Sequence, residues 1–175
     1  MNSRPAVLLS VNLSRSKGVP KKPVAEVELR PDVGVVGDAH SGPGQRQVSL
    51  LASESIDKQR RVFVERQRRD PPSRGCAKAY DAVARLGPGS FAENLTTQGI
   101  DLPSLPLGTR LRVGAEAVLE ISKIGKECHN GCAIFQLLGD CVMPREGVFA
   151  RVLTGGFVRP GDRVNVDESG HPDGQ

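Results

Sequence analysis

The apolar residues of this chain occur in short, valine-rich runs, and glycine and proline separate these runs from one another. The 175 residues include 20 glycines and 13 prolines. Residues 24–29 read V-A-E-V-E-L, and this alternation is typical of a strand with one buried face. Valine favours strands and glycine favours tight turns, so the pattern predicts many short strands with few helices, as in a β-barrel or a β-sandwich.

The apolar runs give the expected elements. Strands are predicted at residues 6–13, 24–29, 47–51, 110–113, 117–124, 148–153, 157–159 and 164–166, with a hairpin joining the fourth run to the fifth. A helix is predicted from Ser53, a suitable N-cap, to about Arg69. The sequence DPPSRG at residues 70–75 ends it, and shorter helices are expected at residues 77–85 and 133–138.

The charge and the aromatic content argue against a nucleic-acid-binding protein. The net charge is +4, and the chain has no Trp, one Tyr and five Phe. Proteins that stack nucleic-acid bases carry more aromatic side chains. Residues 57–69 are nevertheless rich in Lys and Arg. This run is either a solvated helix face or a surface for an anionic partner, and both interpretations stay open.

Length and apolar patterning also predict the domain organisation and the compartment. We assign residues 1–167 to a single domain and residues 168–175 to a polar tail. No run approaches the roughly 18 apolar residues of a membrane span. The apolar run at residues 6–9 is too short for the core of a secretory signal. We therefore expect a cytoplasmic protein, with no membrane partner, whose four cysteines are reduced thiols.

The densest group of reactive side chains lies in the segment GKECHNGCAIFQLLGDC, at residues 125–141. Three of the four cysteines, Cys128, Cys132 and Cys141, fall here together with His129. Lys126 precedes them, and a nearby cation lowers the pKa of a thiol and so favours the nucleophilic thiolate. The segment therefore predicts an activated cysteine, with Cys132 as the leading candidate.

Other interpretations of this cysteine cluster remain open. The thiols could simply fill a small core, as unpaired cysteines often do. Cys128, His129, Cys132 and Cys141 could instead hold zinc, although their first pair is spaced C-x3-C rather than the usual C-x2-C. A disulfide between Cys128 and Cys132 is geometrically possible but is favoured less than zinc, because the expected compartment is reducing.

Three separated segments resemble the signature of the MOSC family, which is named after the C-terminal domain of molybdenum-cofactor sulfurases. They are GVVGDAHSGPGQRQVSLL (residues 34–51), GSFAENLTTQGI (residues 89–100) and IGKECHNGCAIFQLLGDCVMPREGVFARVLTGGFVRPGD (residues 124–162). With KGVPKKPV at residues 17–24 the similarity spans most of the chain, and the bacterial stand-alone members are the most similar type. The resemblance implies a mainly β fold, a strongly coiled β-barrel with a few short helices.

The resemblance also implies that the chain binds the molybdenum cofactor (molybdopterin) or relays sulfur through a cysteine. The cysteine of the family precedes a short apolar run, which corresponds here to Cys132 before residues 133–135. The residues that it implies for the cleft are Gly37, Asp38, His40, Arg46, Gln47, Glu93 and Asn94. Arg46, Arg145 and Arg151 are candidates for holding a pterin phosphate, since a guanidinium fork matches its oxygens.

The expected mechanism makes Cys132 either a persulfide-forming sulfur acceptor or a thiolate ligand to molybdenum. Lys126 and His129 would keep its sulfur anionic, and Cys128 or Cys141 would resolve the persulfide. No pyridoxal-phosphate site is evident in the chain, so a donor such as a cysteine desulfurase would supply the sulfur. The acceptor would be the molybdenum cofactor, a molybdoenzyme or a cofactor-biosynthesis protein.

Two alternatives of another class stand beside this mechanism. One is a non-catalytic module that binds a pterin or an oxyanion, and the other is an adaptor stabilised by zinc. The chain also departs from the family pattern at residues 53–88, which are longer and more basic than expected and include Cys76. Partner contacts in that region stay open.

Overall fold

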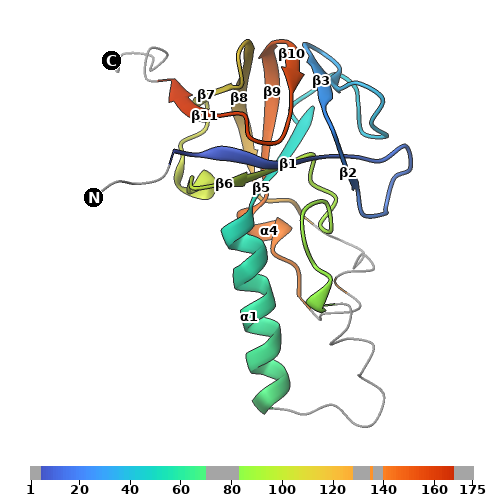
Figure 1. The fold of residues 1–175 in the computed structure, drawn as a ribbon, viewed down its shortest axis with the longest axis vertical. Coiled ribbons are helices and arrows are strands. Elements are labelled where there is room, and N and C mark those ends of the chain that lie inside the picture. Colours follow the sequence, from blue (N-terminus) through green and yellow to red (C-terminus); the bar gives the residue numbers. More distant parts are fainter. Residues whose placement is uncertain (1–4, 70–82, 128–134, 136–139, 168–175) are drawn as a thin grey trace.

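The computed structural model describes residues 5–69, 83–127, 135 and 140–167, and this part of the chain is mainly β with few helices (Figure 1). The strands are β1 (Val7–Leu13), β2 (Lys22–Val24), β3 (Val27–Arg30), β4 (Gly34–Val35), β5 (Val48–Ala52), β6 (Leu95–Gln98), β7 (Arg110–Val113), β8 (Ala117–Ile124), β9 (Val148–Thr154), β10 (Gly156–Val158) and β11 (Val164–Asp167). The helices are α1 (Ser53–Arg69), the 3-10 helix η1 (Leu102–Ser104) and the short α4 (Met143–Glu146).

Eight of the strands form one sheet, in the order β11-β7-β8-β9-β5-β6-β1-β2. The neighbouring strands β5 and β6 are parallel, with Leu50 opposite Leu95, and the other neighbouring strands are antiparallel. A parallel pair needs a crossover connection, and α1 lies within the segment that joins these two strands. A smaller sheet has the order β10-β3-β4.

The strongly coiled barrel that the family resemblance implies is not confirmed, because no sheet in the described part of the chain closes on itself. The outer strands of the larger sheet are β11 and β2. Strand β1 nevertheless contacts the segment before β11: the Leu8 N–H donates to the Asp162 carbonyl and the Gly161 N–H donates to the Leu8 carbonyl, both at 2.8 Å. The first and last strands therefore approach each other without forming a continuous ladder.

The main hydrophobic core is built by the alternation of side chains along the strands. On β7, Leu111 and Val113 are fully buried, whereas the alternate residues Arg110 and Arg112 are exposed. Successive side chains of a strand point to opposite faces, so every second residue enters the core. The core is aliphatic, in keeping with the scarcity of aromatic residues.

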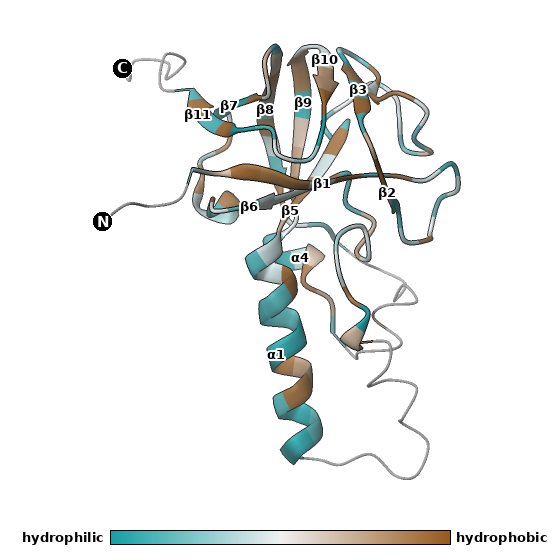
Figure 2. Ribbon diagram, in the orientation of Figure 1, coloured by the Kyte–Doolittle hydropathy of each residue, from teal (hydrophilic) through white to brown (hydrophobic). Residues whose placement is uncertain are grey.

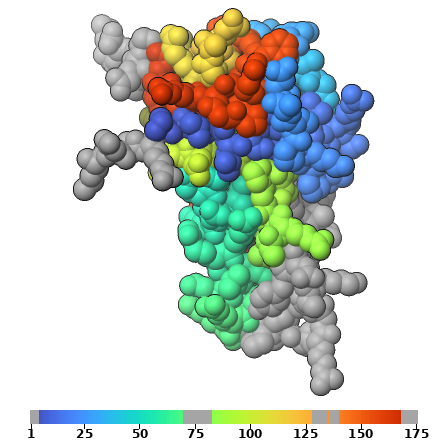
Figure 3. Space-filling model, viewed as in Figure 1, coloured from blue at the N-terminus to red at the C-terminus, as the bar shows by residue number. Residues whose placement is uncertain are grey.

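A second hydrophobic cluster fills the space between α1 and the larger sheet. Ile56 and Phe63 are seven residues apart and so share one face of α1, and each is only 2 % exposed. They pack in a cluster that includes Met143 of α4 and Phe149 of β9. The rest of α1 is largely hydrophilic (Figure 2). The helix extends away from the strand-rich part of the molecule (Figures 1 and 3).

Several of the predicted elements are confirmed. The helix has the predicted bounds, Ser53–Arg69, and β7 and β8 form the predicted hairpin. The single strand predicted at residues 24–29 is wrong, because β2 pairs with β1 in the larger sheet whereas β3 pairs with β10 in the smaller one. An alternating pattern shows that a segment is extended, but it does not show where the segment leaves one sheet for another.

Other predictions fall on residues that the structure does not describe. The break at residues 70–75 and the tail at 168–175 lie wholly outside the described residues, and the helices expected at 77–85 and 133–138 lie largely outside them. Among the helices that are described, none has both the length and the apolar character that crossing a membrane would require.

Part of the basic run in α1 is neutralised within the chain. Lys58 forms an ion pair with Glu146, and Arg60 pairs with Asp57 at 3.0 Å. The remaining arginines of the run, Arg61, Arg66, Arg68 and Arg69, are exposed on the outside of the helix. These contacts are compatible with a solvated face and with a partner surface, so both interpretations remain open.

Gly34 is predicted to be indispensable for stability, and Gly108 provides the matched control. The two glycines have nearly the same backbone angle, with φ of +83° and +85°, but a Cβ on Gly34 would lie 2.1 Å from the Gln47 carbonyl oxygen, whereas one on Gly108 would meet nothing within 4 Å. Gly108→Ala should lower the free energy of unfolding by about 1–2 kcal/mol, because alanine is strained in the left-handed backbone conformation. Gly34→Ala should lose about 1–3 kcal/mol more, because the Gln47 backbone must shift. Equal losses in urea unfolding would refute this account.

Candidate functional site

A pocket of about 350 Å³ lies where several loops of the larger sheet meet the second hydrophobic cluster. Its described lining comes from the turn after β1, the loop between β4 and β5, the strand β5 itself, the segment before β6, the residues after β8, α4 with the residue Cys141 before it, and the start of β9. The lining residues are Lys17, Gly18, Val19, Pro20, His40, Ser41, Arg46, Ser49, Ser90, Phe91, Ala92, Asn94, Lys126, Cys141, Met143, Pro144 and Phe149.

The lining combines basic groups with apolar walls. Lys17, Arg46 and Lys126 bring three cationic side chains, and no Asp or Glu is found among the described lining residues. Phe91 and Phe149 supply aromatic surface. Pockets of this kind hold ligands through apolar contact and fix their orientation with a few polar groups. The arrangement therefore suits an organic anion with a flat apolar part.

Arg46 is held against the wall of the pocket by an aromatic ring. Its guanidinium carbon lies 5.9 Å from the centre of the Phe149 ring, within the range of a cation–π contact. Phe149 belongs to β9 and is itself buried. The contact keeps an exposed arginine beside the pocket, where its N–H groups can reach an anion.

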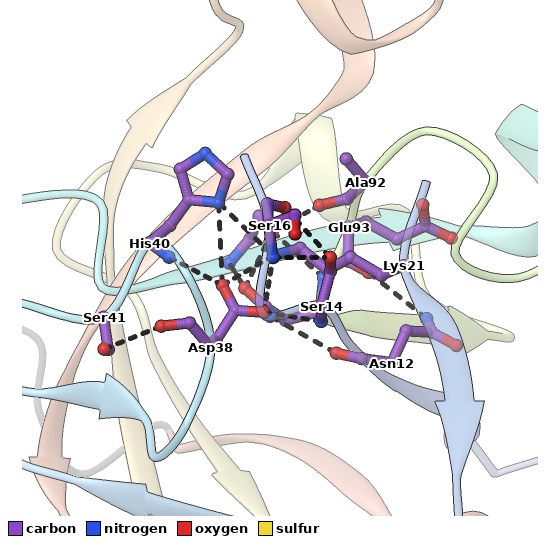
Figure 4. Close-up of polar contacts among 11 residues, drawn as sticks. Asn12, Ser14, Ser16, Lys21, Asp38, His40, Ser41, Ala92 and Glu93 are labelled. Carbon is purple, nitrogen blue, oxygen red and sulfur yellow. Dashed lines mark hydrogen bonds and ion pairs between the residues drawn. The ribbon is translucent and has the colours of Figure 1, made fainter. Parts of the chain in front are cut away.

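A buried ion pair lies next to the pocket residue His40 (Figure 4). The Lys21 ammonium is 2.6 Å from both carboxylate oxygens of Asp38, and the side chains of both residues are only 1 % exposed. The carboxylate also accepts the backbone N–H groups of Ser14 and His40, at 3.1 and 3.0 Å. Burial by itself would raise the pKa of Asp38, but the hydrogen bonds from Lys21 and from these two amides lower it below its ordinary value.

His40 connects the ion pair to the pocket. Its Nδ1 lies 3.4 Å from the Lys21 ammonium, and its half-exposed ring lines the pocket. Burial lowers the pKa of His40, and the positive charges of Lys21, Lys126 and Lys17 lower it further, while Asp38 acts in the opposite direction. The net effect favours the neutral imidazole.

Glu93 supports the wall of the pocket from behind without lining it. Its carboxylate is fully buried and accepts the N–H groups of Gly89 (2.6 Å) and Phe91 (3.1 Å) and the Thr96 hydroxyl (2.8 Å). Burial raises the pKa of Glu93 above its ordinary value, and the hydrogen bonds offset this only in part. The contacts fix the segment that carries Phe91 and Ala92 into the pocket.

Asn94 and Gln47 also bind backbone and side-chain groups of neighbouring strands. The Asn94 Oδ1 accepts the Ser49 N–H at 3.2 Å and the Ser49 hydroxyl at 3.0 Å, and its amide donates to the Asn12 carbonyl at 3.3 Å. Asn94 lines the pocket, whereas Gln47 does not, since its buried Oε1 accepts the Val152 N–H at 2.9 Å. These two polar residues join strands together.

Two of the expected phosphate-binding arginines are engaged elsewhere. Arg145 forms a two-pronged ion pair with Asp140, with both contacts at 2.9 Å, and its hydrogen bond lowers the pKa of that carboxylate. Arg151 pairs with Glu120 across β8 and β9. Neither arginine is among the described lining residues. Gly37 does not line the pocket either; it takes a left-handed turn, with φ of +82°, just before Asp38.

The expected reactive residues Cys128, His129 and Cys132 lie outside the described residues. The described residues on both sides of that segment, Lys126 and Cys141, line the pocket. Cys141 is buried. Within the described part of the chain, no cluster of three or more His, Cys, Asp or Glu side chains could hold a metal ion. The zinc interpretation depends on the undescribed segment and stays a prediction.

Lys21, Lys17 and Phe149 contribute to the site although their residue types and spacing do not predict it. Lys21 and Lys22 are adjacent and chemically identical, yet Lys21 is buried and Lys22 is exposed. No local pattern distinguishes them. The segment KGVPKKPV was part of the family resemblance, and this was the signal that could have directed attention to Lys17 and Lys21.

Comparisons with known proteins agree on the fold. The sequence model of the MOSC domain family matches residues 37–165, well over half of the chain. No curated protein matches the chain significantly.

Solved structures resemble this one across almost all of its length. The YuaD protein from Bacillus subtilis is 19% identical with a TM-score of 0.70, over 93% of this chain and 96% of that one. YiiM from Geobacillus stearothermophilus is 21% identical with a TM-score of 0.61, over 94% of this chain and 76% of that one. YiiM from Escherichia coli is 19% identical with a TM-score of 0.58, over 94% and 69%. At such identities the likeness shows the fold alone.

Glu93 should give the protein a distinct dependence of stability on pH. Because the pKa of Glu93 is raised in the folded state above the ordinary value of 4.5, its contribution to stability is fully present below pH 4.5 and is lost as pH rises through the folded-state pKa. The excess in unfolding free energy of the wild type over Glu93→Gln should therefore shrink between pH 5 and pH 8. Urea unfolding of both proteins at each pH measures it.

The control for this experiment is Glu116→Gln, at an exposed position between β7 and β8. Unfolding of Glu116→Gln over the same pH range measures what the loss of one surface carboxylate contributes, and this contribution is subtracted from that of Glu93→Gln. If the difference in unfolding free energy between the wild type and Glu93→Gln stays constant from pH 5 to pH 8, the account of Glu93 is wrong.

Proposed function

Because this chain belongs to the MOSC domain family, we propose that its pocket binds a pterin phosphate of the molybdenum-cofactor type as a substrate, and that Cys132 relays sulfur to this substrate. The observation that carries the proposal is the pocket between Lys17, Arg46 and Lys126, which combines basic groups with aromatic walls and has no carboxylate in its described lining. Such a pocket matches a ligand with a phosphate at one end and a flat ring system at the other.

The described residues divide between these two parts of the ligand. The Arg46 guanidinium has N–H groups in a planar fork that suits phosphate oxygens, and Lys17 and Lys126 add positive charge. Phe91 and Phe149, both largely buried, add apolar surface to the lining that the ring system would contact. Arg145 and Arg151 would not bind the ligand, because each is paired with a carboxylate outside the pocket.

The cysteine segment begins and ends beside the same pocket. Lys126 precedes Cys128 by two residues, and Cys141 follows Cys132 by nine, and both Lys126 and Cys141 line the pocket. A thiol supplied from this segment would approach a bound ligand and the positive charge of Lys126 together. That charge favours the thiolate, which is the reactive form of a cysteine.

The sulfur-accepting step is a thiol–persulfide exchange. The Cys132 thiolate attacks the outer sulfur of a donor persulfide, a new S–S bond forms on Cys132, and the donor's S–S bond breaks to release the donor thiolate. No external oxidant is needed, because the donor thiol leaves with the electron pair of the broken bond. The donor would be a protein such as a cysteine desulfurase. On delivery, the thiolate of Cys128 or Cys141 would attack the inner sulfur of the Cys132 persulfide, so that a disulfide forms and the outer sulfur leaves as sulfide. The acceptor of this sulfide would be the molybdenum cofactor, free or on a partner protein.

Cys132 should gain one sulfur atom when the protein is incubated with a cysteine desulfurase and cysteine. Mass spectrometry of alkylated peptides should place this sulfur on Cys132, and Cys132→Ser should abolish it. Cys141→Ser is the matched control, since it removes another thiol of the same segment and should leave the labelling of Cys132 intact. Labelling of no cysteine in the wild type would favour a module that binds without turnover, and stoichiometric zinc in protein purified without chelator would favour the adaptor.

Arg46 should contribute directly to affinity for the ligand. Arg46→Ala is expected to weaken the binding of a pterin monophosphate by about tenfold, the loss of one charge-assisted hydrogen bond, as measured by ligand fluorescence. Arg112→Ala is the control, because Arg112 is an exposed arginine of β7 that pairs with Asp167 and does not line the pocket. Equal weakening by both substitutions would point to general charge attraction and would exclude a specific role for Arg46.

A further inference from the structure

We propose that Lys21 is a positioning residue that holds His40 as the neutral tautomer with its proton on Nε2, so that His40 presents a hydrogen-bond donor to an anion in the pocket. Sequence analysis did not identify Lys21, and the family resemblance placed Asp38 and His40 together as residues of the cleft. The tautomer follows from the geometry of the protein alone. Only its use toward an anion rests on the proposed function.

The first step is the direction of the contact between Lys21 and His40. The Lys21 ammonium has N–H donors and no lone pair, so any group that it binds must accept. It lies 3.4 Å from Nδ1 of His40 and 2.6 Å from each Asp38 oxygen. A neutral ring therefore turns the lone pair of Nδ1 toward the ammonium, and the proton must lie on Nε2.

The competing arrangement is disfavoured by distance. A proton on Nδ1 would need an acceptor, and the nearest carboxylate oxygen, Oδ1 of Asp38, is 3.6 Å away, too far for a hydrogen bond. That oxygen already accepts the Lys21 ammonium and the backbone N–H of His40, at 2.6 and 3.0 Å. A proton on Nδ1 would also face the positive charge of Lys21.

Lys21 cannot easily turn away from His40. Its side chain is 1 % exposed, and its backbone N–H donates to the Gly89 carbonyl at 2.9 Å. The two chain segments are in close contact, because a Cβ on Gly89 would lie 2.2 Å from the Lys21 carbonyl oxygen. The ammonium is thus held by packing as well as by Asp38.

The charged groups around His40 also favour the neutral ring. Lys21, Lys126 and Lys17 oppose protonation, as does burial, and Asp38 is the group that favours it. Asp38 is largely neutralised by its contact with Lys21. Near neutral pH the pocket therefore has a donor at His40 that adds no charge of its own.

The orientation of the ring directs this donor away from the ion pair. Figure 4 shows the Nδ1 edge of His40 facing Lys21, with the other ring nitrogen on the opposite side. Because His40 lines the pocket, Nε2–H is available to a ligand there. Lys21 and Asp38 touch no ligand in this scheme, and they act through His40.

The test is nitrogen NMR of the imidazole rings in the full chain without ligand. The chain has three histidines, His40, His129 and His171, and His40→Gln identifies the signals of His40 by their loss. At pH 7 the wild type should show a protonated Nε2 and an unprotonated Nδ1 at His40. A proton on Nδ1, an even mixture of tautomers or a doubly protonated ring at pH 7 would overturn the proposal.

Variants of Lys21 then test the cause. Lys21→Met should give mixed tautomers and raise the pKa of His40, because a positive charge is lost and Asp38 is left unpaired. Lys21→Arg should retain the Nε2–H form, since a guanidinium also donates and cannot accept. If Lys21→Met does not fold, Lys21→Arg decides together with the wild type, and loss of the Nε2–H form in folded Lys21→Arg would count against the proposal.

Titration with a pterin monophosphate separates this inference from the proposed function. Binding that shifts the Nε2–H signal of His40 supports both. An Nε2–H tautomer that is present but does not respond to the pterin monophosphate would uphold the role of Lys21 while rejecting the pocket's proposed ligand. Binding of the pterin monophosphate to a protein in which His40 carries its proton on Nδ1 would uphold the proposed ligand and reject the role of Lys21.

Discussion

The buried ion pair between Lys21 and Asp38 connects the parts of the chain from which the pocket is made. Asp38 accepts the Ser14 N–H at the end of β1 and the His40 N–H of its own loop, while the backbone of Lys21 pairs with Gly89 before β6. Three segments that are far apart in the sequence thus meet at one pair of charges. Removing one partner of such a pair leaves the other charge buried and unpaired, at a cost of about 3–5 kcal/mol, so the two residues must be kept together.

The buried polar residues around the pocket are joined in the same way. Glu93 and Asn94 are buried, and their side chains bind backbone groups of the neighbouring segments. Buried polar groups need hydrogen-bond partners, and here the partners are the amides that shape the wall of the pocket. Asp38, Gln47 and Glu93 do not line the pocket, whereas Asn94 does. The Asp38 carboxylate accepts the backbone N–H of His40, and the Glu93 carboxylate accepts that of Phe91, so these two buried groups place residues that line the pocket.

Local patterns succeeded where the structure depends on neighbours in the sequence. The helix Ser53–Arg69 and the hairpin of β7 and β8 could be predicted, because a helical apolar stripe and a short turn between alternating runs are local properties. They failed where the chain changes sheet, as between Val24 and Val27, because strand pairing is decided by distant partners. Which of the adjacent residues Lys21 and Lys22 is buried is likewise decided by distant partners.

The sequence by itself determined that the chain is mainly β, that its core is aliphatic, and that its motifs belong to the MOSC domain family, because these follow from residue types and their spacing. The tertiary structure alone decided which polar residues face the pocket and which lie behind it. Asp38 and His40 are two residues apart, yet one is buried against Lys21 and the other lines the pocket. That division depends on how three distant segments pack, and no local pattern contains it.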